Sequence, residues 1–328
     1  MKKRVVEAKK SEVVKDAPFA EKGGDGPTAE GWHSIESFLR CPKEYQFEKV
    51  RGVHVPSNVM PDYFAIGILL HVAKGMWFSK RFRTDDATMK TIHAAIHKTA
   101  STSKKPIRVE AIQLALRYFT EYVEHYKIRP LPHAIAAEHY IKGTLKTDAG
   151  YEETRTARLD DVSTYPEAGG KLCIGESKTT STSIQDLTTQ YTLHGQPLLQ
   201  LALWEASPDG KAKYGDVAGV MLDGIVKGYG KTRSKFGRVF MPKPNEKTME
   251  WFIKNLLRSV AAAKKVDWNT EVPRNITMCT RLVGRARVSC PYLKLCQHGR
   301  AASSQYVLEG GKSMLDWKAP GRVVPPWE

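Results

Sequence analysis

Three charged side chains on two neighbouring predicted strands have the types and spacing for metal-assisted hydrolysis. Asp160 closes the segment Arg158-Leu-Asp160, and Glu176 and Lys178 follow within Gly175-Glu-Ser-Lys178. Residues two apart in a strand share a face, so Glu176 and Lys178 project together. Carboxylates supply the oxygen ligands that Mg²⁺ prefers, and a lysine beside them orients or deprotonates the attacking water. The spacing therefore predicts hydrolysis of a phosphodiester bond at this hairpin.

A solvent-facing charge pair is the simpler interpretation of a Glu-x-Lys triplet. Here the charges follow apolar residues in strands that are otherwise typical of buried ones, where an unpaired charge is costly. Asp161 competes with Asp160 as a ligand, but its parity places it on the opposite face, so we predict Asp160. His71 lies in the apolar segment AIGILLHVAKGMWF, where a lone histidine is usually a core residue with a satisfied hydrogen bond.

The apolar periodicity predicts the elements that position these residues. A helical region comes first, and strands from Ala134 onward form a meander or hairpin that carries the charged residues. We expect an α/β fold, in which a central mixed sheet is flanked by helices and a helical insertion precedes the sheet. The predicted helices span 35–40, capped by Ser34, then 42–50, 62–80, 86–104, 106–127, 188–206 and the segment KTMEWFIKNLLRSVAAAKKV.

Charge and composition restrict the class of protein. The chain has 51 Lys and Arg against 35 Asp and Glu, a net charge of +16, which favours a polyanionic partner such as nucleic acid. No apolar run is long enough for a membrane span, and the basic start lacks the apolar stretch of a secretory signal, so we expect a cytoplasmic protein with no membrane partner. Residues 1–30 are poor in large apolar groups, which predicts a disordered basic tail.

Taken together, the motifs resemble the PD-(D/E)xK nuclease superfamily, in the branch similar to the RecB nuclease domain, the AddB nuclease and CRISPR-associated RecB-like exonucleases. Ser34-Ile-Glu-Ser-Phe-Leu-Arg-Cys-Pro-Lys-Glu-Tyr-Gln-Phe is similar to the opening helix of that branch. Gly67-x-x-x-His71, Arg158-Leu-Asp160 and Glu176-Ser-Lys178-Thr179 resemble its next three motifs, in order. Glu138 matches a more variable acidic position.

The resemblance also implies roles for individual residues. It makes Asp160, Glu176 and Lys178 catalytic and gives a divalent metal, Mg²⁺ or Mn²⁺, to His71, Asp160, Glu176 and the carbonyl of Ser177. The family has a downstream Gln-x-x-x-Tyr helix. This chain offers Gln196-x-x-x-Gln200 and Gln200-x-x-x-Trp204, and we predict Gln196 as the catalytic glutamine, with Gln200 as the alternative.

The function that the resemblance implies is a metal-dependent DNA exonuclease of recombination, repair or end processing, of phage or bacterial origin. The nuclease domain is expected over 31–300, with a helical region at 62–130 and a C-terminal extension at 301–328. No P-loop motif is present, so a helicase or recombination protein would be a separate partner. A structure-selective endonuclease and a catalytically inactive DNA-binding protein on the same fold remain alternatives.

Five cysteines, an odd number, favour metal binding or free thiols over a disulfide framework. The family resemblance implies a [4Fe-4S] cluster on Cys41, ahead of the nuclease motifs, and on Cys279, Cys290 and Cys296 after them. Structural zinc is the competing metal, with His298 as a substitute ligand, and unliganded thiols are the third interpretation. Cys173 is predicted to be a core thiol within a strand.

Overall fold

The computed structural model describes residues 31–55, 59–228, 230, 232–268, 270, 272–283 and 286–308. The predicted basic tail over 1–30 lies outside the described residues. The part of the predicted C-terminal extension from 309 to 328 lies outside them as well.

A mixed sheet forms the centre of the molecule and confirms the α/β prediction. Its strands lie in chain order, and each pairs antiparallel with its neighbour except the parallel pair in the middle, β4 with β5. The connection between these parallel strands is long because it must cross the sheet, and it carries three helices. The strands are β2 (His133–Lys146), β3 (Glu152–Tyr165), β4 (Lys171–Thr180), β5 (Gly219–Val226) and β6 (Lys235–Pro242).

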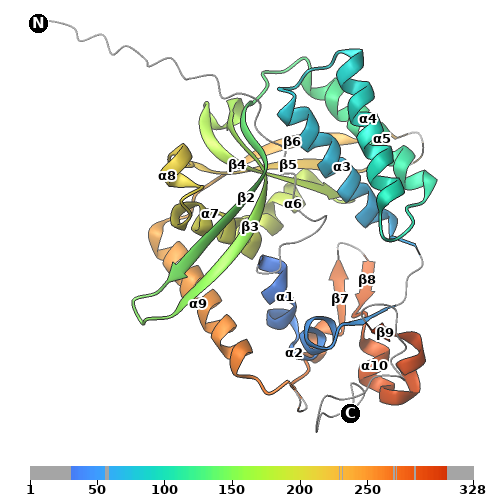
Figure 1. Ribbon diagram of the computed structural model, residues 1–328, viewed down its shortest axis with the longest axis vertical. Helices are drawn as coiled ribbons and strands as arrows, with labels where there is room; N and C mark the ends of the chain where they lie inside the picture. Colours follow the sequence, from blue (N-terminus) through green and yellow to red (C-terminus); the bar gives the residue numbers. More distant parts are fainter. Residues whose placement is uncertain are drawn as a thin grey trace, which may run out of the picture.

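Helices cover both faces of this sheet (Figure 1). The predicted helical insertion forms one layer, in which α3 (Asp62–Ser79), α4 (Asp86–Thr102) and α5 (Val109–Tyr126) bury an aromatic-rich core. The opposite layer contains α6 (Ile184–Tyr191), α7 (Gly195–Ala206), the short α8 (Lys211–Tyr214) and α9 (Glu246–Lys265). Strand β5 serves both layers, since Leu222 packs toward α7 and α9 while Ile225 packs toward α3 and α5.

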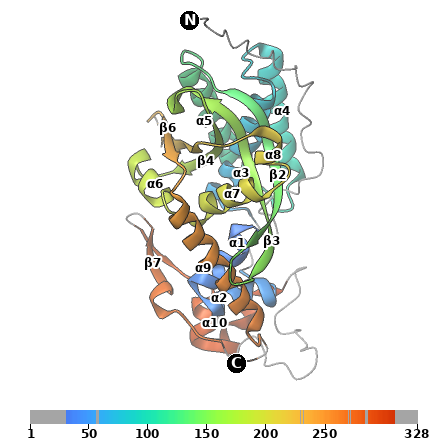
Figure 2. The same cartoon turned by 90° about the vertical axis from the view of Figure 1, so that its left-hand side faces the viewer.

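The beginning and the end of the described chain form a smaller unit below the sheet (Figures 1 and 2). Strand β1 pairs with β9, and a small core of Phe47, Val53, Tyr292, Leu295 and Tyr306 joins the two ends. Its N-terminal elements are α1 (Trp32–Arg40), α2 (Pro42–Tyr45), a π-helical turn (Gln46–Val50) and β1 (Val53–His54). Its C-terminal elements are 3-10 turns at Ile276–Met278 and Gly299–Gln305, β7 (Thr280–Val283), β8 (Ala286–Ser289), α10 (Leu293–His298) and β9 (Val307–Leu308).

Two local predictions were wrong. The helix expected over 188–206 is broken, because α6 ends at Tyr191 and a new N-terminus forms at Gly195, where the ring of His194 accepts a hydrogen bond from the amide of Gln196 at 3.3 Å. Ser34 does not cap the first helix. That helix begins at Trp32, so Ser34 lies in its first turn, and its hydroxyl donates to the carbonyl of Gly31 at 2.7 Å.

The sheet divides into a fork beside the charged motifs. Strand β3 pairs with β2 over nearly its whole length, but it pairs with β4 only over Asp161–Tyr165, opposite Lys171–Gly175. Beyond these pairs β3 and β4 diverge, and the first side chains past the last pair are Asp160 on β3 and Glu176 on β4. The fork therefore places both predicted carboxylates at one opening of the sheet.

Candidate metal centre

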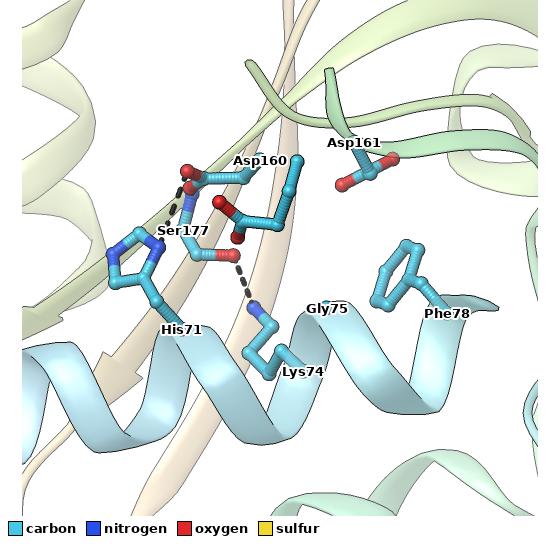
Figure 3. A pocket seen from close by; sticks show the side chains of 8 residues that line it. His71, Lys74, Gly75, Phe78, Asp160, Asp161 and Ser177 are labelled. Atoms are coloured by element: carbon cyan, nitrogen blue, oxygen red, sulfur yellow. Dashed lines mark hydrogen bonds and ion pairs between the residues drawn. The ribbon is translucent and has the colours of Figure 1, made fainter. Parts of the chain in front are cut away.

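Three residues from three separate elements converge at the fork. His71 comes from α3, Glu138 from β2 and Asp160 from β3, and one ligand atom of each lies within 4.8 Å of the other two. The ring nitrogen Nδ1 of His71 is 3.2 Å from Oδ1 of Asp160 (Figure 3). Among the described residues this is the group of His, Cys, Asp and Glu compact enough to hold one ion. We call His71, Glu138 and Asp160 the fork cluster.

Asp160 is held in its charged form. Burial alone would raise its pKa, but the neighbouring His71 and Lys178 charges and a hydrogen bond from the amide of Ser177, at 2.7 Å, lower the pKa to about 2. The Ser177 amide is available because β3 has already left β4 at this point. Burial also opposes protonation of His71, yet the adjoining Asp160 carboxylate outweighs it and raises the pKa of His71.

Glu138 is forced into the cluster by its backbone. The neighbouring pairs Ala137–Asp161 and His139–Leu159 place it opposite Asp160, and its φ of 50° is left-handed, a conformation that costs a non-glycine residue about 1–3 kcal/mol. Its side chain packs over Gly75 of α3, where a Cβ atom would lie 3.2 Å from its Cγ. The glycine thus leaves room for the carboxylate.

The fork cluster contains two carboxylates that compete for ionisation. Burial and the charge of Asp160 together raise the pKa of Glu138 to about 7, even though Arg158 lies 3.2 Å from one of its oxygens. Two acids beside one imidazole, in a pocket that is partly open, are a donor set suited to a hard or borderline divalent cation. Binding of such a cation would release the proton that Glu138 holds near neutral pH.

Glu176 and Lys178 lie beside the fork cluster and contact one another. The Nζ atom of Lys178 is 2.5 Å from Oε1 of Glu176, whose side chain is 1% exposed. The amides of Gln196 and Gln200 each donate to a different oxygen of Glu176 at 2.7 Å. Gln196 and Gln200, the two candidates for the catalytic glutamine, therefore both contact Glu176. Gln196 additionally accepts from Lys178 at 3.4 Å.

The predicted ligands are thus divided between two adjoining groups. The structure brings His71 and Asp160 together, while the oxygens of Glu176 are held by amides and by Lys178. The charge of Lys178 nevertheless acts on the fork cluster, because it lowers the pKa of both His71 and Asp160. Burial disfavours the charged amine, but the Glu176 carboxylate outweighs it, so the pKa of Lys178 is raised and the side chain is a cation.

Tyr191 is a residue of this site that the sequence motifs did not identify. It ends α6, and its ring lies 5.5 Å from the Nζ atom of Lys178 and stacks on His194. The family pattern places a tyrosine after the glutamine, whereas this aromatic ring precedes Gln196 and comes from the other helix. The sequence signal for Tyr191 was an aromatic residue at the point where the helix predicted over 188–206 is broken.

A second set of buried charges lies on the face of β4 opposite to Glu176 and Lys178. Ser177 pairs in register with Asp223 of β5, which pairs with Arg238 of β6. Lys74 of α3 donates to the hydroxyl of Ser177 at 2.5 Å and to Asp223 at 2.9 Å, and Tyr122 of α5 also hydrogen-bonds Asp223. We call Lys74, Tyr122, Ser177, Asp223 and Arg238 the sealed network. It fastens the helical layer to the sheet directly behind the fork.

The sealed network was also missed in the sequence. Its signal was a single charge inside each of two apolar segments, HVAKGMWF and VMLDGIV, because a buried charge requires a partner of opposite sign. Asp161 belongs to the same face, as its parity predicted. It accepts hydrogen bonds from Ser163 and Tyr165 at 2.7 Å each, and burial raises its pKa to about 6. In Figure 3 it lies apart from the pair of His71 and Asp160, on the side of the pocket near Phe78.

The four cysteines predicted as cluster ligands all lie in the small unit below the sheet. Cys290 donates its amide to the carbonyl of Cys279 at 2.8 Å, and the thiol of Cys41 accepts from the amide of Asn275 at 3.4 Å. Burial, with a smaller contribution from Cys41, raises the pKa of Cys290 and of Cys296 to about 11. Cys173 is separate, in β4, within the core as predicted.

Comparisons with known proteins add no family assignment, since no protein-family model matches the chain and no curated protein matches it. Among the described residues, no helix has both the length and the apolar character that crossing a membrane requires.

Proposed function

We propose that this protein is a metal-dependent deoxyribonuclease of the PD-(D/E)xK type, a phosphodiester hydrolase that acts as an exonuclease on DNA. The observation that carries the proposal is the fork itself. It places Asp160, Glu176 and Lys178 on diverging strands of a mixed sheet, with His71 directed at Asp160 from the covering helix. A group of buried charges where two strands diverge would destabilise an ordinary hydrophobic core.

The donor set of the site fits Mg²⁺ or Mn²⁺. His71, Glu138 and Asp160 offer ligand atoms within 4.8 Å of one another, and Glu176 and the carbonyl of Ser177 adjoin them on β4. When bound, such a metal supplies charge neutralisation at a scissile phosphate and a more acidic water. The left-handed φ of Glu138 is the kind of strain that is retained where a side chain must face a ligand.

The chain's own residues would then act on water and substrate. Lys178 is a cation held by Glu176, so it orients the attacking water and stabilises charge on the phosphate and does not take a proton. Gln196 bridges Glu176 and Lys178 and fixes both in place.

The proposed setting follows from charge and from the resemblance. A net charge of +16 would attract DNA by its phosphates without reading its sequence. We propose that the enzyme works in the cytoplasm of a bacterium or a phage-infected cell, and that any helicase or recombination protein is a separate chain.

The test is a nuclease assay on purified protein with labelled single-stranded and duplex DNA in Mg²⁺, Mn²⁺ or EDTA. We expect metal-dependent degradation, which Glu176→Ala and Lys178→Ala each abolish. Covalently closed circular DNA separates the alternatives, because an exonuclease leaves it intact and a structure-selective endonuclease does not. Binding of DNA without cleavage under every metal condition would instead support an inactive DNA-binding protein.

We also propose that Cys41, Cys279, Cys290 and Cys296 hold a [4Fe-4S] cluster. The four thiols come from both ends of the described chain, so a shared cofactor would fasten α1 to the C-terminal elements.

The cofactor is tested on protein purified without oxygen. Visible absorption with stoichiometric iron and sulfide, lost in Cys290→Ala and kept in Cys173→Ala, is the expected result. Zinc without iron would identify the competing metal.

A further inference from the structure

An open strip runs along α3 from the fork cluster toward the start of that helix. Phe64, Gly67 and His71 are spaced by three and four residues and so share one helical face. The side chain of His71 is 31% exposed, and Phe64 is 49% exposed. Between them, a Cβ atom on Gly67 would meet no heavy atom within 4 Å. Among the described residues, therefore, no side chain covers Gly67 between His71 and Phe64.

Exposed apolar and cationic side chains lie on the segments next to the start of α3. Tyr63 is 69% exposed and Val109, at the start of α5, is 63% exposed. The loop before α5 is fastened there, because the amide of Met60 donates to the carbonyl of Pro106 at 2.9 Å. That loop carries Lys104 and Lys105, both exposed and neither with an ion-pair partner among the described residues.

We propose that this strip, defined by Phe64, Gly67 and His71, is the path of an unpaired DNA strand, and that Phe64 stacks on a base beside the scissile phosphate. The inference rests on the proposed function, and it adds the substrate form that the site accepts. Exposed aromatic rings beside free lysines are the combination that binds single strands, since the rings take bases and the cations take phosphates. Two helical turns separate Phe64 from His71, about 11 Å along the axis.

Gly67 is the residue that most directly supports this path. Glycine in the middle of a helix lowers stability, and no atom of the described part of the chain lies within 4 Å of a Cβ built at Gly67, so a larger residue should fit and strengthen α3. A glycine that protein contacts do not require is explained if a ligand backbone passes over it. Gly75, about two turns further along α3, differs because Glu138 fills the space above it.

The experiment measures binding apart from cleavage. Fluorescence anisotropy with a labelled oligo(dT) strand and a labelled blunt hairpin duplex, in EDTA, compares the full-length wild type with four variants. Phe64→Ala should weaken oligo(dT) binding by about fivefold to 150-fold, the range for losing one stacked base, and Phe64→Trp should restore it. Trp251→Ala is the matched control, since Trp251 is an aromatic side chain 64% exposed on α9, in the opposite layer.

Gly67→Leu should raise the Tm and weaken oligo(dT) binding by at least about tenfold. Opposite changes in stability and affinity cannot arise from misfolding. Wild-type affinity in both Gly67→Leu and Phe64→Ala would overturn the strip as the path and leave the nuclease proposal standing. Tight oligo(dT) binding that depends on Phe64, without cleavage in any metal, would support the strip and overturn the nuclease. Failure to bind either DNA would overturn the strip.

Discussion

Two neighbouring groups of charged side chains beside α3 carry their charge in different ways. The fork cluster combines two carboxylates with one imidazole, and their side chains are 15–31% exposed. In the sealed network, Lys74 and Arg238 balance Asp223, with Glu167 3.5 Å from Arg238, and the side chains of Lys74, Asp223 and Arg238 are at most 4% exposed. Charges that are balanced and closed to solvent hold a structure together, whereas an open excess of acid attracts a cation.

Lys74→Met should produce the largest change. It leaves Asp223 with one fewer cation in a region without solvent, and breaking a buried ion pair costs about 3–5 kcal/mol of the free energy of unfolding. Urea denaturation measures the loss. Because Lys74 balances Asp223 and not the fork cluster, Mg²⁺ should leave the deficit unchanged. A loss below about 1 kcal/mol, or its recovery in Mg²⁺, would erase the distinction between the two regions.

The fork cluster should make the free energy of unfolding depend on pH. Glu138 has a pKa of about 7 in the folded protein against 4.5 for the ordinary carboxyl, so the unfolded chain loses this proton first and stability falls as pH rises from 4.5 to 7. The shift corresponds to about 3 kcal/mol. Asp160 acts in the opposite sense, with stability lost only as pH falls from 3.8 to 2, below that window.

Glu138→Gln is the variant that isolates this effect. Its stability, measured by urea denaturation in EDTA, should exceed that of the wild type increasingly from pH 4.5 to 7. Addition of Mg²⁺ at pH 8 should close the gap, because the cation offsets the repulsion between Glu138 and Asp160. A pH-independent difference between the two proteins would show that the carboxylates do not share a site.

The contrast also explains what the sequence could predict. Period-two and helical spacing identified the strands that carry the charged motifs and the helical insertion before them, because burial dictates those patterns, but did not identify the edge strand β6. The separation of Asp160 from Asp161 followed from strand parity alone. The fork could not be foreseen, since it depends on where β3 stops pairing with β4 while it remains paired with β2, and pairing of distant segments leaves no local signal.

Glu138 and Lys74 show the same limit for side chains. The left-handed φ of Glu138 arises opposite Asp160 in a pair of strands, and no spacing announces it. Lys74 was a charge in an apolar helix, which predicts a partner without naming it. Its partner Asp223 lies 149 residues away and is reached only through the tertiary fold.

Gln196 and Gln200 should separate activity from stability. Gln196 contacts both Glu176 and Lys178, so Gln196→Ala should lower nuclease activity about 10- to 100-fold, as for other residues that orient a catalytic group. Gln200 is 2% exposed and contacts Glu176. Gln200→Ala should therefore cost about 1–3 kcal/mol of unfolding free energy, because an oxygen of a buried carboxylate loses its donor. Loss of stability in Gln196→Ala with loss of activity in Gln200→Ala would instead make Gln200 the catalytic glutamine.

Tyr191 should have the smallest effect. Its ring stabilises the Lys178 ammonium by a cation–π contact of about 0.5–1 kcal/mol, and its hydroxyl also hydrogen-bonds Lys178. Tyr191→Leu should therefore reduce kcat about two- to fivefold, while Tyr191→Phe, which keeps the ring, should have the smaller effect. Steady-state rates on linear DNA measure both. The pair discriminates between ring and hydroxyl, because equal losses in the two variants would transfer the role to the phenol. Since the ring contacts Lys178 and lies outside the sealed network, neither variant should alter the pH dependence that Glu138 imposes on stability.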